Sequence, residues 1–244
     1  MKTARIVDWL NATLDVHSFD DVSNNGVQIS SSRKEISSVA FAVDASVRAV
    51  EAAAEKGAGM LVVHHGISWG GGIRMIEGGV YGVVKAAVMA DIALYACHLP
   101  LDAHPVLGNN ARLLKELHLV KSARAFRYRS SEIGFVAKAT ARTQKALDSF
   151  AAAAGVEGVR VKAGSLVGVC SGGAGDFAEE AKRLGCEVYI TGEANWGDVI
   201  AAENCGMRML CLGHYATEVW GVRSLSEAMK KSLKVETIDL TKEL

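Results

Sequence analysis

The feature that most restricts the fold is a regular alternation between short apolar runs rich in β-branched residues and longer amphipathic runs. Residues 36–43 and 60–63 have the first pattern, which is typical of buried strands. Residues 46–56 and 143–154 have the second pattern, with apolar positions at helical spacing. Strands that alternate with helices along a chain form sheets covered by helices, so we predict an α/β fold.

The length of 244 residues allows one large domain or two modest ones, and we predict two. The segment 121–131, KSARAFRYRSS, is polar and basic without a clear period, which is typical of a junction between domains. We therefore place the first α/β domain at 1–125 and the second at 126–244. This division leaves open that the C-terminal segment packs back on the first domain.

Charge restricts the classes of partner. The 27 basic and 27 acidic residues cancel, so no overall field attracts nucleic acid or an anionic membrane. One segment does interleave basic and aromatic side chains, namely Lys121, Arg124, Phe126, Arg127, Tyr128 and Arg129. That pattern fits contacts with nucleic acid. A solvated linker is the simpler interpretation, and we predict no nucleic-acid partner.

The location of the protein follows from what the chain lacks. No apolar run approaches the roughly 20 residues of a membrane span, and the first residues have helical spacing rather than the apolar core of a signal peptide. We expect a soluble, cytoplasmic protein with no membrane partner. The five cysteines form no CxxC pair and lie in apolar surroundings, which favours buried free thiols.

A pair of histidines ends the apolar run LVVHH. Successive residues of a strand point to opposite faces, so His64 and His65 can serve one site only where the strand stops, and Gly66 marks that point. Burying two adjacent imidazoles without partners is costly, and a metal ion is an economical partner. A hydrogen-bonded pair near the surface explains the dipeptide equally well.

Two further clusters place polar side chains after predicted strands. CHLPLDAHP brings Asp102 just past a strand, with Pro100 stiffening its approach, although this stretch alone fits a solvated loop. In GHYATE, Thr217 is a good N-cap, which would place His214 at a strand end and Glu218 in the first helical turn. Taken alone, Glu218 is equally well explained as an acidic residue that interacts favourably with the dipole at the N-terminus of a helix. Since ligands bind at the carboxyl edge of wound sheets, three such clusters favour a pair of divalent transition-metal ions.

Five motifs occur in order over almost the whole chain: SNNGVQ, LVVHHGISWGG, ALYACHLPLDA, TGEA and LGHYATE. Together they resemble the Nif-three-like family, whose members are often labelled GTP cyclohydrolase I type 2. The resemblance covers roughly residues 1 to 240. It implies two α/β domains with mixed sheets flanked by helices, a metal site between them, and a toroidal homohexamer.

Carried over position by position, the resemblance also implies a ligand set. Two divalent metal ions per subunit would be held by His64, His65, Asp102, His214 and Glu218. His98 would lie beside the site as an outer or acid/base residue. The ions could be Zn, Fe, Mn, Co or Ni, because mixtures of imidazole and carboxylate accept all of these metals.

The expected metal pair leads to three hypotheses. The first is a metal-dependent hydrolase acting on a nucleotide-like substrate, with His98 moving the proton. If the family label applies, the reaction is the hydrolytic opening of the imidazole ring of GTP. The second is a hexameric metal-binding scaffold or regulatory protein without turnover. The third, a metal-dependent phosphoesterase or nucleic-acid hydrolase, is less favoured because the chain has no net charge.

Three other features each have a functional and a structural interpretation. Gly172, Gly173 and Gly175 follow a predicted strand and could cradle a phosphate, but their spacing matches no nucleotide motif, which favours a tight turn. Trp69 could stack on a ring or simply close the core. In TGEANWGD, Trp196 stands where several members of the resembled family carry histidine, which separates this chain from them.

Overall fold

The computed structural model describes residues 1–129 and 131–243, without the side chains of residues 123 and 124. The side chain of Arg124, one of the basic residues for which a solvated linker was preferred over nucleic-acid contact, therefore lies outside the described part of the chain. The chain divides into two compact units. Unit 1 comprises Met1–Leu107 and Gly221–Leu244, and unit 2 comprises Gly108–Trp220. Within the described part of the chain, no helix is both long enough and apolar enough to span a bilayer.

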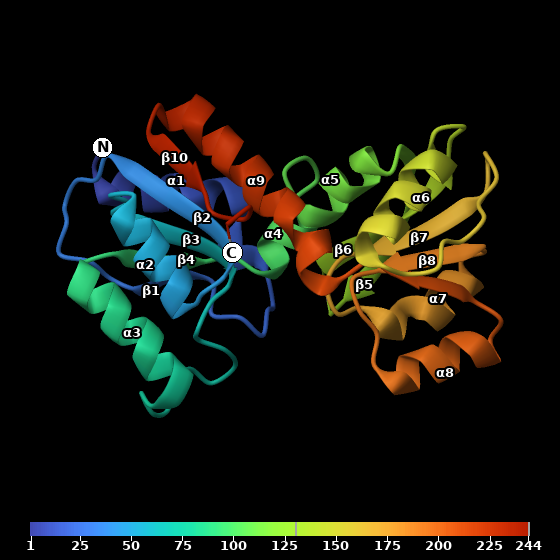
Figure 1. The fold of residues 1–244 in the computed structure, drawn as a ribbon, viewed down its shortest axis with the longest axis horizontal. Helices are drawn as coiled ribbons and strands as arrows, with labels where there is room; N and C mark the ends of the chain where they lie inside the picture. Colours follow the sequence, from blue (N-terminus) through green and yellow to red (C-terminus); the bar gives the residue numbers. More distant parts are fainter. Residues whose placement is uncertain (130, 244) are drawn as a thin grey trace. The chain divides into compact units, whose positions relative to one another are not determined.

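The mixed α/β fold has two mixed sheets, each flanked by helices (Figure 1). The sheet of unit 1 has the strand order β1-β4-β3-β2-β10, with β1 antiparallel to β4 and the other neighbours parallel. Its strands are β1 (Gly26–Ile29), β2 (Ser38–Asp44), β3 (Met60–His65), β4 (Ala93–Ala96) and β10 (Glu236–Asp239). The helices of unit 1 are α1 (Thr3–Leu14), η1 (Val16–Ser18), α2 (Val47–Glu55), α3 (Gly78–Ala90) and α4 (Leu99–Ala103).

The central strands β2, β3 and β4 of unit 1 consist almost entirely of apolar residues and are buried on both faces of the sheet. On one face of the sheet, buried apolar side chains of β2 and β3 pack against those of α2 and α3. Figure 1 shows these two helices in front of the sheet. The Tyr95 hydroxyl donates to Asn11 Oδ1 of α1 on the other face, at 2.7 Å. Helix α2 begins as predicted, since the Ser46 side chain accepts the amide of Ala49.

The sheet of unit 2 has the order β5-β6-β7-β8-β9, in which β6 is antiparallel to both β5 and β7, and β7, β8 and β9 run parallel to one another. Its strands are β5 (Leu119–Tyr128), β6 (Ser131–Ala139), β7 (Leu166–Cys170), β8 (Val188–Thr191) and β9 (Arg208–Cys211). Its helices are α5 (Asn109–Glu116), α6 (Thr143–Ala154), η2 (Gly175–Phe177), α7 (Ala178–Arg183) and α8 (Trp196–Asn204). Helix α9 (His214–Leu233) begins in unit 2 and ends in unit 1.

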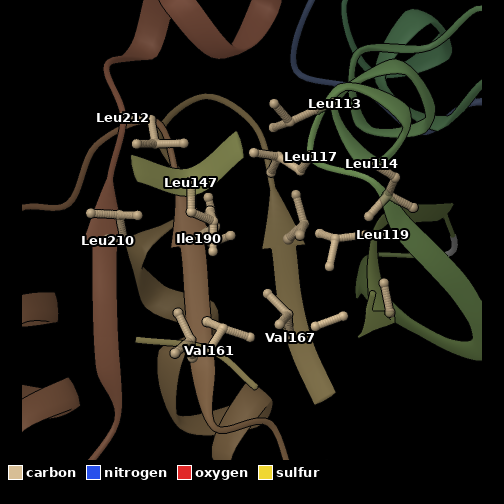
Figure 2. Packing of buried hydrophobic residues seen from close by; sticks show 14 of the residues in the cluster. Leu113, Leu114, Leu117, Leu119, Leu147, Val161, Val167, Ile190, Leu210 and Leu212 are labelled. Atoms are coloured by element: carbon tan, nitrogen blue, oxygen red, sulfur yellow. The ribbon is translucent and has the colours of Figure 1, made fainter. Parts of the chain in front are cut away.

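The core of unit 2 is a set of leucine, isoleucine and valine side chains between α5, α6 and one face of the sheet (Figure 2). Leu147 of α6 lies between the strands and the helix and is fully buried. Helices α7 and α8 lie on the opposite side of the sheet from α6 (Figure 1). On that second face the ring of Phe126 packs against Phe177 and Tyr189, each with a centroid distance of 5.6 Å.

The division between the units differs from the predicted one. Residues 121–128 of the basic segment belong to β5 and residue 131 begins β6, both inside unit 2, and the chain passes between the units at residues 107 and 108 instead. The charged side chains of Lys121 and Arg127 lie on β5, an edge strand that is paired on one side only. Residues 221–244 belong to unit 1.

One helix start also differs from prediction. Helix α9 begins at His214, so Thr217 lies inside its first turn rather than capping it. The N-cap of α5 is Gly108, and the next two residues, Asn109 and Asn110, are helical and buried. Asn110 uses its side chain to bond Ile133 O and the amide of Ser171.

All five cysteines are free, as expected. Cys97, Cys170 and Cys186 are buried, and Cys205 and Cys211 are half-buried. Burial raises the pKa of the Cys97 thiol far above its usual value, with smaller contributions from Asp102 and Asp21. This thiol therefore stays protonated at neutral pH, which is typical of a structural cysteine.

Candidate metal centre

The histidine pair occupies the last two positions of β3. His64 is fully buried and His65 is half-buried, and their ring centroids are 4.6 Å apart. The side chain of Gln28 and the methyl group of Ala96 lie so close to Gly66 that a Cβ there would fall within 2.6 Å of them. A glycine is therefore required immediately after the pair, where the strand ends.

His98 joins the histidine pair from the connection between β4 and α4. Its ring centroid lies 5.1 Å from that of His64 and 5.7 Å from that of His65. The three imidazoles offer ligand atoms within 4.8 Å of one another. Unit 1 thus assembles a three-histidine group that could hold a metal ion.

The three imidazoles share one hydrogen-bonding pattern. His64 Nδ1 lies 2.9 Å from Cys97 O, His65 Nδ1 lies 2.8 Å from Asp44 Oδ1, and His98 Nδ1 lies 2.9 Å from Asp21 Oδ1. Carbonyl and carboxylate oxygens only accept, so each Nδ1 must carry the hydrogen. In the neutral ring the lone pair is then on Nε2. Metal-binding histidines are typically oriented in this way by an oxygen acceptor on their other nitrogen.

A carboxylate completes the group in unit 1. Asp102 is buried on α4, and its Oδ2 lies 3.5 Å from His64 Nε2. Pro100 stands in the first turn of α4, where a missing amide hydrogen costs nothing. The fold therefore holds Asp102 where the sequence predicted a fixed carboxylate, beside the Nε2 atom of a buried histidine.

Unit 2 brings together the other two predicted ligands. His214 and Glu218 are one turn apart on α9, with His214 Nε2 3.2 Å from Glu218 Oε1. His214 Nδ1 lies 3.0 Å from Glu193 Oε1. The hydrogen bond with Glu218 is the largest influence on the imidazole and raises the pKa of His214 to about 9, against the opposing effect of burial. Glu218 itself is 2% exposed.

The glycine-rich turn after β7 supports this second group. The amide of Gly172 donates to Thr217 Oγ1, that of Ser171 to Asn110 Oδ1, and that of Ala174 to Thr191 Oγ1. These amides are used inside the protein, which favours the tight-turn interpretation over a phosphate cradle. A Cβ at Gly172 would lie 2.3 Å from Glu218 Oε1, so the glycine makes room for the carboxylate.

The motif SNNGVQ was not predicted to belong to the site, yet it holds the loops that carry the histidines. Gln28 Oε1 accepts the amides of Ile67 and Ser68, just after the histidine pair. Asn25 Oδ1 accepts the amide of His98 at 2.8 Å. The sequence analysis also missed three carboxylates that contact histidines, namely Asp21, Asp44 and Glu193. Asn25, Gln28 and Glu193 could have been found from the sequence, because they lie in the motifs SNNGVQ and TGEA. Asp21 and Asp44 lie outside these motifs, and no sequence signal marks them.

Trp69 lies at the edge of the three-histidine group. Its ring is edge-on to His98, with centroids 5.2 Å apart, and its Nε1 donates to Gly66 O at 3.0 Å. The residue is 37% exposed. Trp69 therefore does not close the core, and its partly exposed side chain borders the histidines.

Comparison with known proteins places this arrangement in a family. Residues 1–243 match the family described as Duf34/NIF3 (NGG1p interacting factor 3). The chain belongs to the Duf34/NIF3 family. The NIF3 chain is 38% identical to a protein of Archaeoglobus fulgidus named GTP cyclohydrolase 1 type 2 homolog, over 98% of both chains. A protein of the same name from Pyrococcus horikoshii is 36% identical over 98% of this chain and 97% of that protein.

Solved structures agree on the fold of this NIF3 protein. A structure described as protein ybgI, of unknown function, superposes with a TM-score of 0.86 at 28% identity. The match covers 98% of this chain and 97% of the other. Unit 1 thus brings together His64, His65, His98 and Asp102, and unit 2 brings together His214 and Glu218. That the two groups form one centre stays a prediction.

Proposed function

We propose that this NIF3 protein binds two divalent metal ions through His64, His65, Asp102, His214 and Glu218 and acts as a metal-dependent hydrolase. The observation that carries the proposal is the shared orientation of the three imidazoles in unit 1, each with Nδ1 on an oxygen acceptor. Such an arrangement leaves Nε2 as the donor atom for a metal.

The donor atoms fit transition metals. Imidazole nitrogen is a good ligand for Zn, Fe, Co and Ni, and carboxylate oxygen also suits Mn. Each unit combines imidazole with a buried carboxylate, Asp102 beside His64 in unit 1 and Glu218 beside His214 in unit 2. An imidazole nitrogen beside a carboxylate oxygen is a combination of ligand atoms that divalent transition-metal ions accept.

A bound divalent ion supplies Lewis acidity and lowers the pKa of a coordinated water. The rest of the chemistry belongs to the side chains. His98 is held by Asp21 and Asn25 beside the proposed ligands and is the residue that would accept and return a proton. Trp69 borders the same group and is 37% exposed, so its indole ring is a candidate stacking partner for a planar substrate ring.

The substrate class is proposed from the relatives. Proteins that match this chain over nearly its full length carry the name GTP cyclohydrolase 1 type 2 homolog. We therefore propose a nucleotide-like substrate, with hydrolytic opening of the purine imidazole ring of GTP as the first reaction to test.

The deciding experiment measures metal content and turnover in the same preparations. We expect elemental analysis to find about two transition-metal ions per chain in the wild-type protein. Glu218→Gln should lose at least one of them, since the change removes a charged ligand at nearly constant volume. Glu227→Gln is the matched control, because Glu227 is exposed on the same helix.

Turnover assays then separate the three hypotheses. Metal-loaded protein is incubated with GTP and with a generic phosphodiester. Opening of the GTP ring that is lost in Glu218→Gln and kept in Glu227→Gln supports the proposal. Cleavage of the phosphodiester alone would favour a phosphoesterase. Metal binding without turnover on either substrate would favour a scaffold or regulatory protein, and absence of bound metal would refute the site.

Assembly into a homohexamer is also proposed. Several large apolar side chains are exposed on the single chain in α3 and the segment before it: Met75, Ile76, Tyr81, Val88 and Met89. Exposed apolar residues in such numbers are typical of a surface that is covered by another protein. Light scattering should give about 155 kDa for six chains of 25.8 kDa, whereas a value near one chain mass would refute the hexamer.

A further inference from the structure

Asp21 has an unusual environment for a carboxylate in a loop. Its side chain is 2% exposed, and each oxygen accepts two hydrogen bonds. Oδ1 accepts the amide of Ser23 at 3.0 Å and Nδ1–H of His98 at 2.9 Å. Oδ2 accepts the Asn25 side chain and the amide of Leu99, both at 2.9 Å. A carboxylate with this many donors is held in one orientation.

The bonds of Asp21 join two segments that are far apart in sequence. Residues 21–25 precede β1, whereas His98 and Leu99 follow β4. Asn25 adds a bond from its Oδ1 to the amide of His98. The backbone of residues 98 and 99 and the ring of His98 are therefore all anchored to the same short segment, which leaves the imidazole little freedom to turn.

Asp21 differs from the group that orients His64. His64 Nδ1 faces the neutral carbonyl of Cys97, while His98 Nδ1 faces a buried carboxylate. A hydrogen bond to an ionised acceptor is about twice as strong as a neutral one. His65 Nδ1 also faces a carboxylate, that of Asp44, but the Asp44 side chain is 55% exposed whereas that of Asp21 is buried. Water screens a buried charge less, so the bond to Asp21 is the stronger of the two.

We propose that Asp21 is a positioning residue that keeps His98 in the Nδ1–H form, with Nε2 as the atom that accepts and returns the proton. The role in proton transfer rests on the proposed hydrolase function. The tautomer itself does not, because it follows from hydrogen bonds within unit 1. The two statements can therefore fail separately.

The test is nitrogen NMR of metal-free protein labelled with ¹⁵N-histidine, with the His98 signals assigned from a His98→Gln variant. In the wild-type protein we expect His98 to be in the Nδ1–H form. In Asp21→Asn the ratio of Nδ1–H to Nε2–H should fall by about tenfold, because the charge-assisted bond becomes a neutral one. Asp44→Asn is the matched control, since it should change the signals of His65 and leave those of His98 unchanged.

Two outcomes would overturn the proposal. The first is a wild-type His98 found mainly in the Nε2–H form, a result that needs no variant to fold. The second is an unchanged tautomer ratio in Asp21→Asn. If the wild-type protein turns over GTP, Asp21→Asn should lower kcat about tenfold or more and leave metal content and KM nearly unchanged. A purely structural role would instead change stability without changing the tautomer. Loss of metal from the wild-type protein would count against the proposed function alone.

Discussion

Replacing Gly172 by alanine tests the packing of the glycine-rich turn against the proposed ligands. Gly172 has φ +70°, and an added Cβ would lie 2.3 Å from Glu218 Oε1. The left-handed conformation alone costs alanine about 1–2 kcal/mol. Forcing a group into a packed site costs a further ~1–3 kcal/mol. Because Glu218 is almost fully buried, the carboxylate must move, and its alignment with His214 is lost.

Gly155 provides a matched control in the same unit. It ends α6 with φ +67°, and an added Cβ there would meet nothing within 4 Å. Gly155→Ala should therefore show the conformational cost only. Urea denaturation gives the unfolding free energy of each variant, and the difference between the losses in Gly172→Ala and Gly155→Ala is the energetic cost of the clash with Glu218. Elemental analysis gives the metal content of each variant. Equal destabilisation with unchanged metal content in both variants would refute the role assigned to Gly172.

Three further predictions concern other parts of the molecule. Burial raises the pKa of Asp21, but the hydrogen bonds with His98, Asn25 and Ser23 outweigh it and lower the pKa to about 2. The ionised carboxylate therefore stabilises the folded protein fully above the usual pKa of 3.8, and this stabilisation is lost as the pH falls through 2. Asp21→Asn should accordingly cost about 2 kcal/mol in urea denaturation at pH 7, and the difference from wild type should shrink towards pH 2; a constant difference would contradict the assigned pKa. Leu147→Ala removes a fully buried core side chain and should lower the unfolding free energy by about 2–5 kcal/mol in the same assay, whereas a change below about 1 kcal/mol would contradict the packing of Figure 2. Gln28→Leu should release the amides of Ile67 and Ser68 and speed their hydrogen exchange at least tenfold, with unchanged exchange as the contrary result.

Helices with strong local signals were predicted well from the sequence. The bounds of α6, Thr143–Ala154, match the predicted range 143–154, because apolar residues recur at helical spacing throughout that segment and Gly155 follows it. Strand β5 was missed for a physical reason. It is an edge strand, and its exposed positions carry charges that hide the alternation of a half-buried strand.

The sequence identified individual candidate ligands but not the hydrogen bonds that hold the histidines in place. His64, His65 and Asp102 were found because each follows an apolar run or a proline, which are local features. Asp21 could not be found in this way, since its partner His98 is 77 residues away and nothing in the segment before β1 marks a buried carboxylate. Glu218 was placed correctly in the first part of a helix even though that helix begins one turn earlier than predicted.

Unit 2 interrupts unit 1 in the sequence, and this affects the order in which the chain can fold during synthesis. Strand β10, near the end of the chain, pairs with β2, which is made some two hundred residues earlier. Until β10 leaves the ribosome, β2 has an open hydrogen-bonding edge, whereas every strand of unit 2 is already present. Unit 2 can therefore fold first, and the nascent chain carries an exposed, aggregation-prone edge in unit 1 until β10 has been made.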